Sequence, residues 1–468
     1  AALTDSGAVV CWGDAARGGE PGAVAGQLAS RVARIYSTVR AFAALKQGGA
    51  VVTWGDEGSG GNSSAVVHHL TAGVKKVYCT ALAFAALKES GLLITWGNAG
   101  FGGDSSSVVK SLQQDVCKVY SNAQCFAAVT HEGSVVTWGD SASGGDSSAA
   151  AEQLRGQVVD ICSGSRSFAA IKENGALVTW GRDCIRDGEP ILGNVSSGVK
   201  KVYSTGSAFA ACKTTGSVVT WGDANAGGDS RSVAEQLADG VCMIHCGASA
   251  FAALKEAGAV VTWGEADTVE NAAAVAGQLA EGVCKLYSNV GAFAVLKEGG
   301  AVVTWGDAES GGNSEAVAAQ LSSEVVKVYS TDRAFAALKQ AGSVVTWGHV
   351  QGGGDSIAVS LALASGVRKI FSSSHAFVAL KVCGRIAAWG DADFGGDNLQ
   401  AEEQLVEASG KVVDIVCNSH RFMDPDMDED GGAFVALAEV QTRALPASLA
   451  PAPLAPLVSE YSEGCAHE

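Results

Sequence analysis

The sequence is short of positive charge, with 32 Lys and Arg against 49 Asp and Glu and a net charge of −17. A nucleic-acid ligand is therefore not expected, because phosphate binding depends on clustered Lys and Arg. No apolar run approaches the roughly 18 residues of a membrane-spanning helix, and the first residues lack the basic and apolar segments of a secretory signal. No Gly-x-Ser-x-Gly turn, phosphate-binding loop or Cys–His pairing stands out from the background of the sequence, so no catalytic residue is predicted and we expect a protein that is not an enzyme.

Cysteine supplies neither a disulfide framework nor a metal pattern. The 13 cysteines are an odd number and fall at irregular positions. Cys242 and Cys246 form the one close pair, and no histidines accompany them at the spacing of a zinc site. This usage fits a reducing compartment, the cytoplasm or an organelle lumen, better than secretion.

What the sequence does contain is one pattern repeated many times. All 10 tryptophans are followed by glycine, and successive Trp-Gly pairs are 42 residues apart, with one step of 41. They are Trp12, Trp54, Trp96, Trp138, Trp180, Trp221, Trp263, Trp305, Trp347 and Trp389. A second marker, Phe-Ala-Ala-Leu-Lys or a close variant, lies ahead of nearly every pair, as at Phe42–Lys46. Such regularity indicates about ten copies of one unit, each burying its apolar faces against its neighbours.

Each unit has the pattern of three short strands and a short helix. Residues 75–79, 83–88 and 92–96 are β-prone, and a three-residue turn that ends in Gly91 joins the last two as a hairpin. A glycine loop follows, and residues 105–113 have the spacing of a short helix. Both faces of the strands are apolar or small, which is typical of sheets that are covered on both sides.

These units predict a mainly β fold, a β-propeller of about ten short repeats over residues 1–440. The alternative is an open β-rich solenoid; the tight hairpin favours the propeller, because solenoid coils normally run parallel to one another.

The chain opens inside a unit, so we expect a processed or truncated product. The strand at residues 8–13 and the segments at 411–417 and 434–438 are incomplete units, and we expect them to complete one blade and close the ring. Residues 441–468 are rich in Pro, Ala and Ser and are expected to be a flexible or surface-draped tail.

The string Gly49–Asp56, preceded by Phe42–Lys46 and followed by a glycine pair, resembles the repeat of the regulator of chromosome condensation family. The shared core is Leu-x-x-x-Gly-x-Val-x-x-Trp-Gly, as at Leu45–Gly55, and the likeness extends from residue 1 to about residue 438. The family's repeat is usually longer, and its Gly-Gln-Leu-Gly is Gly-Gly-Asp-Ser here. The resemblance implies a β-propeller, which in that family usually has seven blades.

The family's known functions include guanine-nucleotide exchange on a small GTPase, and substrate or partner binding in very large, HERC-like ubiquitin ligases. Chromatin-linked exchange factors of this type need basic surfaces, whereas this chain is acidic. A ligase needs a catalytic domain, for which nothing outside the repeats is long enough. We therefore predict a scaffold or adaptor that binds a protein partner as a subunit of a larger assembly. An exchange factor, the substrate-binding part of a ligase and a calcium-dependent binding module remain as alternatives.

Acidic and amide residues recur in the glycine loops. One follows most Trp-Gly pairs and another lies six residues later, as at Asp307 and Asn313. Such pairs bind cations weakly in some proteins, or they stabilise the turn and begin the helix that follows. Their presence in nearly every unit favours the structural interpretation.

The insertion at Met423–Gly432 is the sharper candidate for a metal site. Asp426, Asp428 and Asp430, followed by Gly431, alternate in a way that can wrap a Ca²⁺ ion. The bidentate glutamate of an EF-hand is missing, because Leu437 stands there. The alternative is a solvated acidic loop. No other cofactor is predicted.

Two units lose the Gly-Gly-Asp loop, at Arg182–Pro190 and at Glu265–Asn271. Variant loops are where a repeat protein places specificity for a partner. The residues that we predict to contact a protein partner are Arg182, Arg186, Glu189, Asp267 and Glu270. Neutral decay of redundant copies is the alternative explanation.

Overall fold

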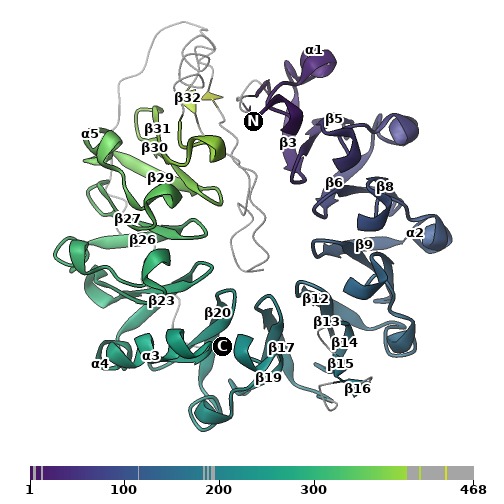
Figure 1. The fold of residues 1–468 in the computed structure, drawn as a ribbon. Coiled ribbons are helices and arrows are strands. Elements are labelled where there is room, and N and C mark those ends of the chain that lie inside the picture. Colours follow the sequence, from purple (N-terminus) through teal and green to yellow (C-terminus); the bar gives the residue numbers. More distant parts are fainter. Residues whose placement is uncertain are drawn as a thin grey trace, which may run out of the picture.

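The computed structural model describes residues 1–3, 7–11, 14–113, 115–182, 185–186, 189–190, 195–397, 411–412 and 438–439. Within these ranges, nine three-stranded antiparallel sheets follow one another around a central space (Figure 1). Each sheet is called a blade below. The predicted mainly β fold built from propeller-type repeats is confirmed, and the radial arrangement excludes the linear solenoid.

The three strands of a blade run from the central space outward in chain order (Figure 1). The inner strands are β3 (Val32–Ser37), β6 (Val74–Cys79), β9 (Val116–Ser121), β12 (Val158–Ser163), β17 (Val199–Ser204), β20 (Val241–Cys246), β23 (Val283–Ser288), β26 (Val325–Ser330) and β29 (Val367–Ser372). The middle strands are β4 (Ala41–Lys46), β7 (Ala83–Lys88), β10 (Cys125–Thr130), β13 (Ser167–Lys172), β18 (Ala208–Lys213), β21 (Ala250–Lys255), β24 (Ala292–Lys297), β27 (Ala334–Lys339) and β30 (Ala376–Lys381). The outer strands are β5 (Val51–Gly55), β8 (Leu93–Gly97), β11 (Val135–Gly139), β14 (Leu177–Gly181), β19 (Val218–Gly222), β22 (Val260–Gly264), β25 (Val302–Gly306), β28 (Val344–Gly348) and β31 (Ile386–Gly390).

The chain ends do not complete a shared blade, and that prediction is wrong for the strands that the structure describes. β1 (Ala2–Leu3) pairs with β2 (Val9–Val10), and β32 (Lys411–Val412) pairs with β33 (Ala438–Glu439). The two pairs belong to separate sheets, so the sheets are not closed into one ring. The reason is that β1 and β33 are both copies of the middle strand, and one blade has room for a single middle strand.

Short helical turns connect the outer strand of one blade to the inner strand of the next and lie on the outer perimeter (Figure 1). Four of them contain a four-residue α-helix: α1 (Ala25–Leu28), α2 (Val109–Leu112), α4 (Ala276–Leu279) and α5 (Ser360–Leu363). Others are 3₁₀ turns, among them η4 (Ser64–His69), η8 (Ser148–Ala150), η11 (Arg231–Val233) and η14 (Glu315–Val317). A leucine at the end of each turn, such as Leu321, is buried and anchors it to the blade. The exception is α3 (Ala266–Ala274), a nine-residue helix that replaces a glycine loop.

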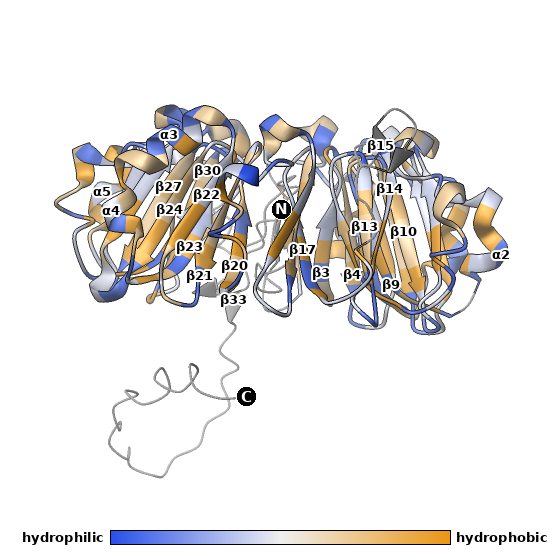
Figure 2. Cartoon of the chain, turned by 90° about the horizontal axis from the view of Figure 1, so that it is seen from below, coloured by the Kyte–Doolittle hydropathy of each residue, from blue (hydrophilic) through white to orange (hydrophobic). Residues whose placement is uncertain are grey.

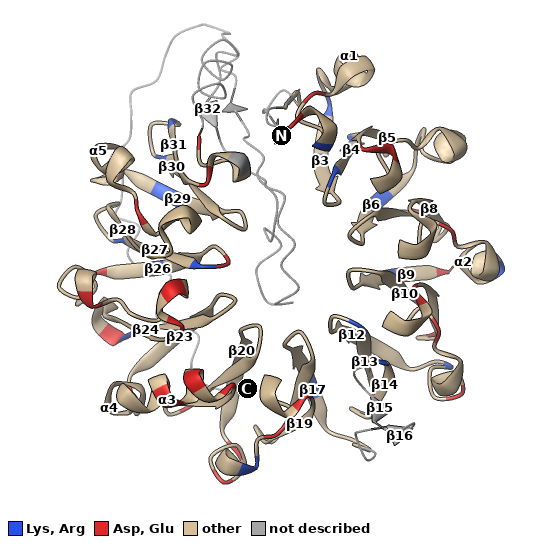
Figure 3. Ribbon diagram, in the orientation of Figure 1, with Lys and Arg blue, Asp and Glu red and all other residues tan. Residues whose placement is uncertain are grey.

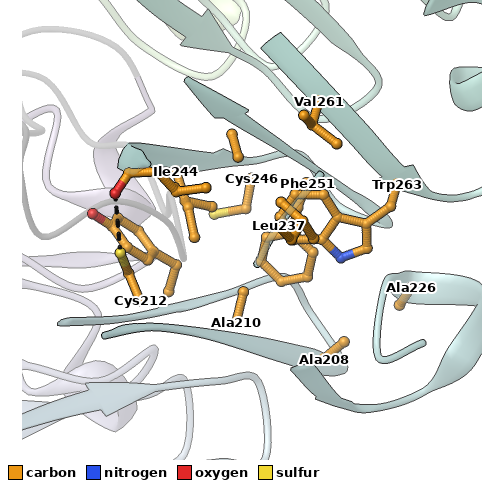
Figure 4. Packing of buried hydrophobic residues seen from close by; sticks show 13 residues of the cluster. Ala208, Ala210, Cys212, Ala226, Leu237, Ile244, Cys246, Phe251, Val261 and Trp263 are labelled. Atoms are coloured by element: carbon orange, nitrogen blue, oxygen red, sulfur yellow. Dashed lines mark hydrogen bonds between the residues drawn. The ribbon is translucent and has the colours of Figure 1, made fainter. Parts of the chain in front are cut away.

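Hydrophobic side chains from two adjacent repeats fill each junction between blades. The middle strand uses both of its faces: Ala208 and Ala210 of β18 pack toward the next blade, against Phe251 and Trp263 (Figure 4). Small alanines allow the close approach, and the aromatic pair fills the remaining volume. In Figure 2 the strands are predominantly hydrophobic along their length, whereas the hydrophilic segments gather at the two faces of the ring. The prediction that both strand faces are covered is confirmed.

Hydrogen bonds also join the inner ends of neighbouring blades. The Ser121 Oγ atom donates to the Cys79 carbonyl at 2.8 Å, and the Ser330 Oγ atom repeats this bond to the Ser288 carbonyl at 3.0 Å. The backbone N–H of Asp332 donates to the Ser374 carbonyl of the next blade at 2.9 Å. These bonds satisfy backbone carbonyl and N–H groups that face the next blade at the inner edge of the array.

The acidic loop residues are turn and helix-start residues, which confirms the structural interpretation for the loops in which these hydrogen bonds form. The Asp307 Oδ1 atom accepts the backbone N–H of Glu309 at 3.2 Å, and the Asn313 Oδ1 atom accepts that of Glu315 at 2.9 Å. The same bond holds Ser106 to Asp104 at 2.8 Å and lowers the pKa of the Asp104 carboxyl. Each side chain thus satisfies a donor that the short helical turn leaves open.

The Asp104→Ala variant is expected to be less stable than the wild type by about 1 kcal/mol near neutral pH, a typical value for the loss of such a bond. Because the folded-state pKa of Asp104 is lowered, the carboxylate contributes stability above its unfolded-state pKa and loses it as the pH falls through the folded-state pKa. Urea unfolding of both proteins at about pH 6 and about pH 3 measures this difference. A gap of the same size at both pH values would contradict the assignment.

Candidate partner-binding face at the irregular repeats

The regular glycine loop accepts a hydrogen bond from a buried tryptophan of the next repeat. The Trp263 Nε1–H donates to the Gly227 carbonyl at 3.1 Å, and in Figure 4 the indole nitrogen faces the loop that carries Ala226. Gly227 has a positive φ of 95°, and a Cβ atom there would lie 2.5 Å from the Phe251 ring. Glycine is therefore required both by the backbone and by the ring beneath it.

The same bond forms for seven of the nine tryptophans in the part of the chain that the structure describes. The donors are Trp54, Trp96, Trp138, Trp180, Trp263, Trp347 and Trp389, at 3.0 to 3.1 Å. In the described residues, Trp221 and Trp305 are the exceptions, since the buried indole N–H of each has no acceptor there. The loops that precede these two tryptophans are the two that the sequence marked as irregular.

The sequence of the α3 repeat explains the missing bond. Aligned on their Trp-Gly pairs, Val269 stands where the preceding repeat has Gly227, and Ala272 stands where it has Ser230. Valine does not adopt the positive φ that ends the regular turn, so the chain continues as the helix α3 instead. The Trp305 side chain remains 1% exposed, without the carbonyl that the turn would present.

A second hydrogen bond is lost in the same repeat. In a regular unit the threonine of the outer strand pairs with the serine after the glycine loop, as Thr220 does with Ser230 at 2.9 Å. With Ala272 in place of that serine, the Thr262 Oγ1 atom has no partner in the described residues, and Thr262 is 9% exposed. The α3 repeat thus leaves two buried polar groups unpaired, each costing roughly 1–3 kcal/mol of stability.

Carboxylates line the exposed side of α3. Glu265, Asp267 and Glu270 are exposed, and Asp307 of the next repeat faces the same open groove of about 470 Å³. Figure 3 shows these acidic positions as red segments on and beside α3. The two residues predicted here, Asp267 and Glu270, therefore lie together on one surface.

A groove of about 520 Å³ lies on the other side of α3, lined mainly by apolar residues and also by Gln236, Lys255 and Thr262. Val269, Ala273 and Leu279 line it from the helix side, and Val233 and Val260 line it from the preceding turn and the outer strand. The open groove can receive an apolar side chain of a bound partner, with carboxylates close by across α3.

The other irregular loop carries the remaining predicted residues. Arg182 is exposed and follows the outer strand β14. Arg186 of β15 (Ile185–Arg186) is the pairing partner of Glu189 in β16 (Glu189–Pro190), so their backbones lie side by side. The two sets belong to different blades and do not form a single cluster.

The predicted calcium ligands Asp426, Asp428 and Asp430 lie outside the described residues, and calcium binding there stays a prediction. No group of three or more His, Cys, Asp or Glu that could hold a metal ion occurs in the described part of the chain. None of its helices is long and apolar enough to cross a membrane. The ten cysteines within it are free thiols.

Sequence reasoning missed Thr262 and Trp305. The signal was present, because an alignment of the repeats places Val269 and Ala272 under a glycine and a serine. The sequence did not reveal what the glycine and the serine do in a regular repeat. The glycine carbonyl accepts a hydrogen bond from a tryptophan 36 residues later in the chain, and the serine hydroxyl pairs with a threonine of the outer strand.

The fold is therefore a radial array of three-stranded antiparallel blades. No family model matches the sequence, and no curated protein matches it.

Among solved structures, the chain is similar to Prp20p from Saccharomyces cerevisiae, with 16% identity over 55% of this chain and 80% of that one and a TM-score of 0.31. It is also similar to human WBSCR16, with 17% identity over 57% and 87% of the two chains and a TM-score of 0.32. A third is the CRINKLY WD40 ectodomain of the Arabidopsis thaliana receptor kinase ACR4, with 15% identity, coverage of 57% and 90%, and a TM-score of 0.30. The assignment of the fold rests on the strand order of the blades.

Proposed function

We propose that this protein is a non-enzymatic scaffold that binds a protein partner, as a subunit of a larger assembly, on the face that carries α3. The observation that supports this proposal is the pair of unpaired buried groups, Thr262 Oγ1 and Trp305 Nε1, beneath that helix. A glycine loop satisfies both groups in the regular repeats, so α3 is maintained at a cost in stability. Natural proteins keep such local conflicts chiefly where the altered surface has a function.

The chemistry of the surface indicates the kind of partner. The apolar groove suits a protruding apolar side chain, and the carboxylates Glu265, Asp267, Glu270 and Asp307 suit basic residues that flank it. A partner segment with an apolar anchor and basic neighbours meets both requirements, because complementary charge raises the association rate and favours one orientation.

Replacing Glu265–Ala272 with the eight residues of Asp223–Ser230 restores the regular loop and tests the proposal directly. The graft supplies a glycine carbonyl for Trp305 and a serine hydroxyl for Thr262, so we expect an increase in the free energy of unfolding of about 2–6 kcal/mol, about 1–3 kcal/mol for each group. We also expect loss of the stoichiometric partner that the wild-type protein captures from a native extract. Urea unfolding and quantitative capture measure the two effects.

A matched control is the double variant Asp267→Asn and Glu270→Gln, which keeps α3 but removes two of its charges. It is expected to weaken capture without the gain in stability. Unchanged capture by the grafted chain would indicate neutral decay of the repeat and reject α3 as the binding site. A captured small GTPase whose nucleotide release is accelerated would replace the scaffold with an exchange factor.

A further inference from the structure

The inner strands carry a concentration of positive charge that the composition of the chain does not suggest. The second and third residues of each inner strand are exposed or half-buried, because the strand begins with a bulge next to the central space. Over nine blades these positions hold ten basic residues: Arg34, Lys75, Lys76, Lys118, Lys200, Lys201, Lys285, Lys327, Arg368 and Lys369. At these positions in the nine described inner strands, Asp160 is the only acidic residue. We call these ten basic residues the inner rim.

The inner rim follows the strands closest to the centre of the ring. Figure 3 shows basic segments on inner strands such as β6 and β29, whereas α3 and the glycine loops carry acidic segments. The carboxylate of Asp160 accepts the Tyr120 hydroxyl at 2.7 Å and is occupied by that bond. A positive rim therefore lines the inside of a chain whose net charge is −17.

Several inner-rim side chains are held in place by their neighbours. The Lys76 Nζ atom lies 5.1 Å from the centre of the Tyr78 ring, and the Lys327 Nζ atom lies 5.0 Å from that of Tyr329. The Lys118 Nζ atom donates to the Val159 carbonyl of the next inner strand at 3.0 Å. Ordered cations lose less entropy on binding an anion than freely moving ones do.

We propose that the inner rim binds an extended acidic segment of a partner protein. The inner-rim cations complement a run of carboxylates in charge. This surface is separate from α3, so the proposal stands independently of the proposed function.

The observations favour an acidic peptide over a nucleic acid. Proteins that bind single strands combine basic grooves with exposed aromatic rings on which the bases stack. Here the rings beside the cations are half-buried or buried, and lysines cover those of Tyr78, Tyr203, Tyr329 and Phe371.

Fluorescence anisotropy with labelled deca-glutamate tests the proposal on the full chain. At about 0.1 M salt, where the Debye length is about 10 Å, the wild type is expected to bind deca-glutamate and not to bind deca-glutamine. The variant with Lys75, Lys76, Lys327 and Arg368 all changed to Gln is expected to bind deca-glutamate at least about tenfold more weakly, because it loses four charges that face the ligand. These residues are exposed, so the variant is expected to fold.

The control variant removes four exposed cations from the periphery, with Arg17, Lys110, Arg155 and Arg231 all changed to Gln. It has the same net charge as the inner-rim variant, and its affinity for deca-glutamate is expected to stay within about twofold of wild type, since charges beyond a Debye length are screened. An equal loss in both variants, or equal binding of deca-glutamine, would overturn the inner rim as a site. Tighter binding of an oligo-dT strand of the same length, lost in the inner-rim variant, would replace the acidic peptide with a nucleic acid.

Discussion

The Phe335→Ala variant is expected to lower the free energy of unfolding by roughly 3–5 kcal/mol, the usual loss for a buried phenylalanine. Phe335 of β27 is fully buried and stacks on Trp347, with ring centres 5.4 Å apart and an interplanar angle of 22°. It also packs on Ala292 and Ala294 of the preceding blade, so its removal opens a cavity at the junction between two blades.

Urea unfolding monitored by tryptophan fluorescence measures this loss. In a repeat array each blade contacts only its neighbours, so a weakened junction is expected to separate the transition into two steps. Leu361→Ala is the control: the Leu361 side chain is 92% exposed, and the substitution is expected to change the stability by no more than about 0.5 kcal/mol. A similar small effect for Phe335→Ala would mean that the blades do not pack as described.

The second large effect is expected from a matched pair of tryptophan substitutions. Trp263→Phe removes the donor to the Gly227 carbonyl, whereas Trp305→Phe removes an N–H that has no acceptor in the described residues. Both tryptophans are 1% exposed and stack on a phenylalanine at 5.2 and 5.4 Å, so the packing losses nearly cancel. Trp263→Phe is therefore expected to destabilise the protein by about 1–3 kcal/mol more than Trp305→Phe.

Urea unfolding of the two variants measures this difference. It follows from the two midpoints when both unfolding curves have the same dependence on urea concentration. A second pair, Trp347→Phe and Trp305→Phe, repeats the comparison with another regular repeat, in which Trp347 donates to the Gly311 carbonyl at 3.0 Å. Equal destabilisation in every case would show that the indole N–H of Trp305 is satisfied and that α3 carries no cost in stability from this group.

The periodic markers were sufficient to predict the blade. Phe42, Trp54 and the glycine after it recur at a fixed spacing, and a side chain that recurs in every copy has the same environment in every copy. The hairpin that ends in Gly91, the outer helical turn and the turn-forming role of Asp307 and Asn313 all followed from local patterns. Each depends on contacts within a few residues, which the sequence displays directly.

The candidate site was only half predictable. The sequence marked Asp267 and Glu270 as part of an irregular loop, but the loop became a nine-residue helix between an acidic and an apolar groove. The unpaired Trp305 lies about one repeat away from the residue that deprives it of an acceptor. The inner rim was missed for a similar reason, since its lysines are scattered through the chain and meet only where the inner strands converge.

The sequence by itself determined the blade, because its strands, turns and core contacts lie within one repeat or between two neighbours. It also determined which repeats lose the regular glycine loop. In the α3 repeat, Val269 and Ala272 replace the glycine that the tight turn requires and the serine that the hydroxyl pair requires. Only the tertiary structure decided how the ends behave: β1 and β33 are both middle strands, and one blade cannot hold two. The charge distribution was likewise decided by the radial arrangement of the blades, which gathers basic residues from nine inner strands around one space while the chain as a whole stays acidic.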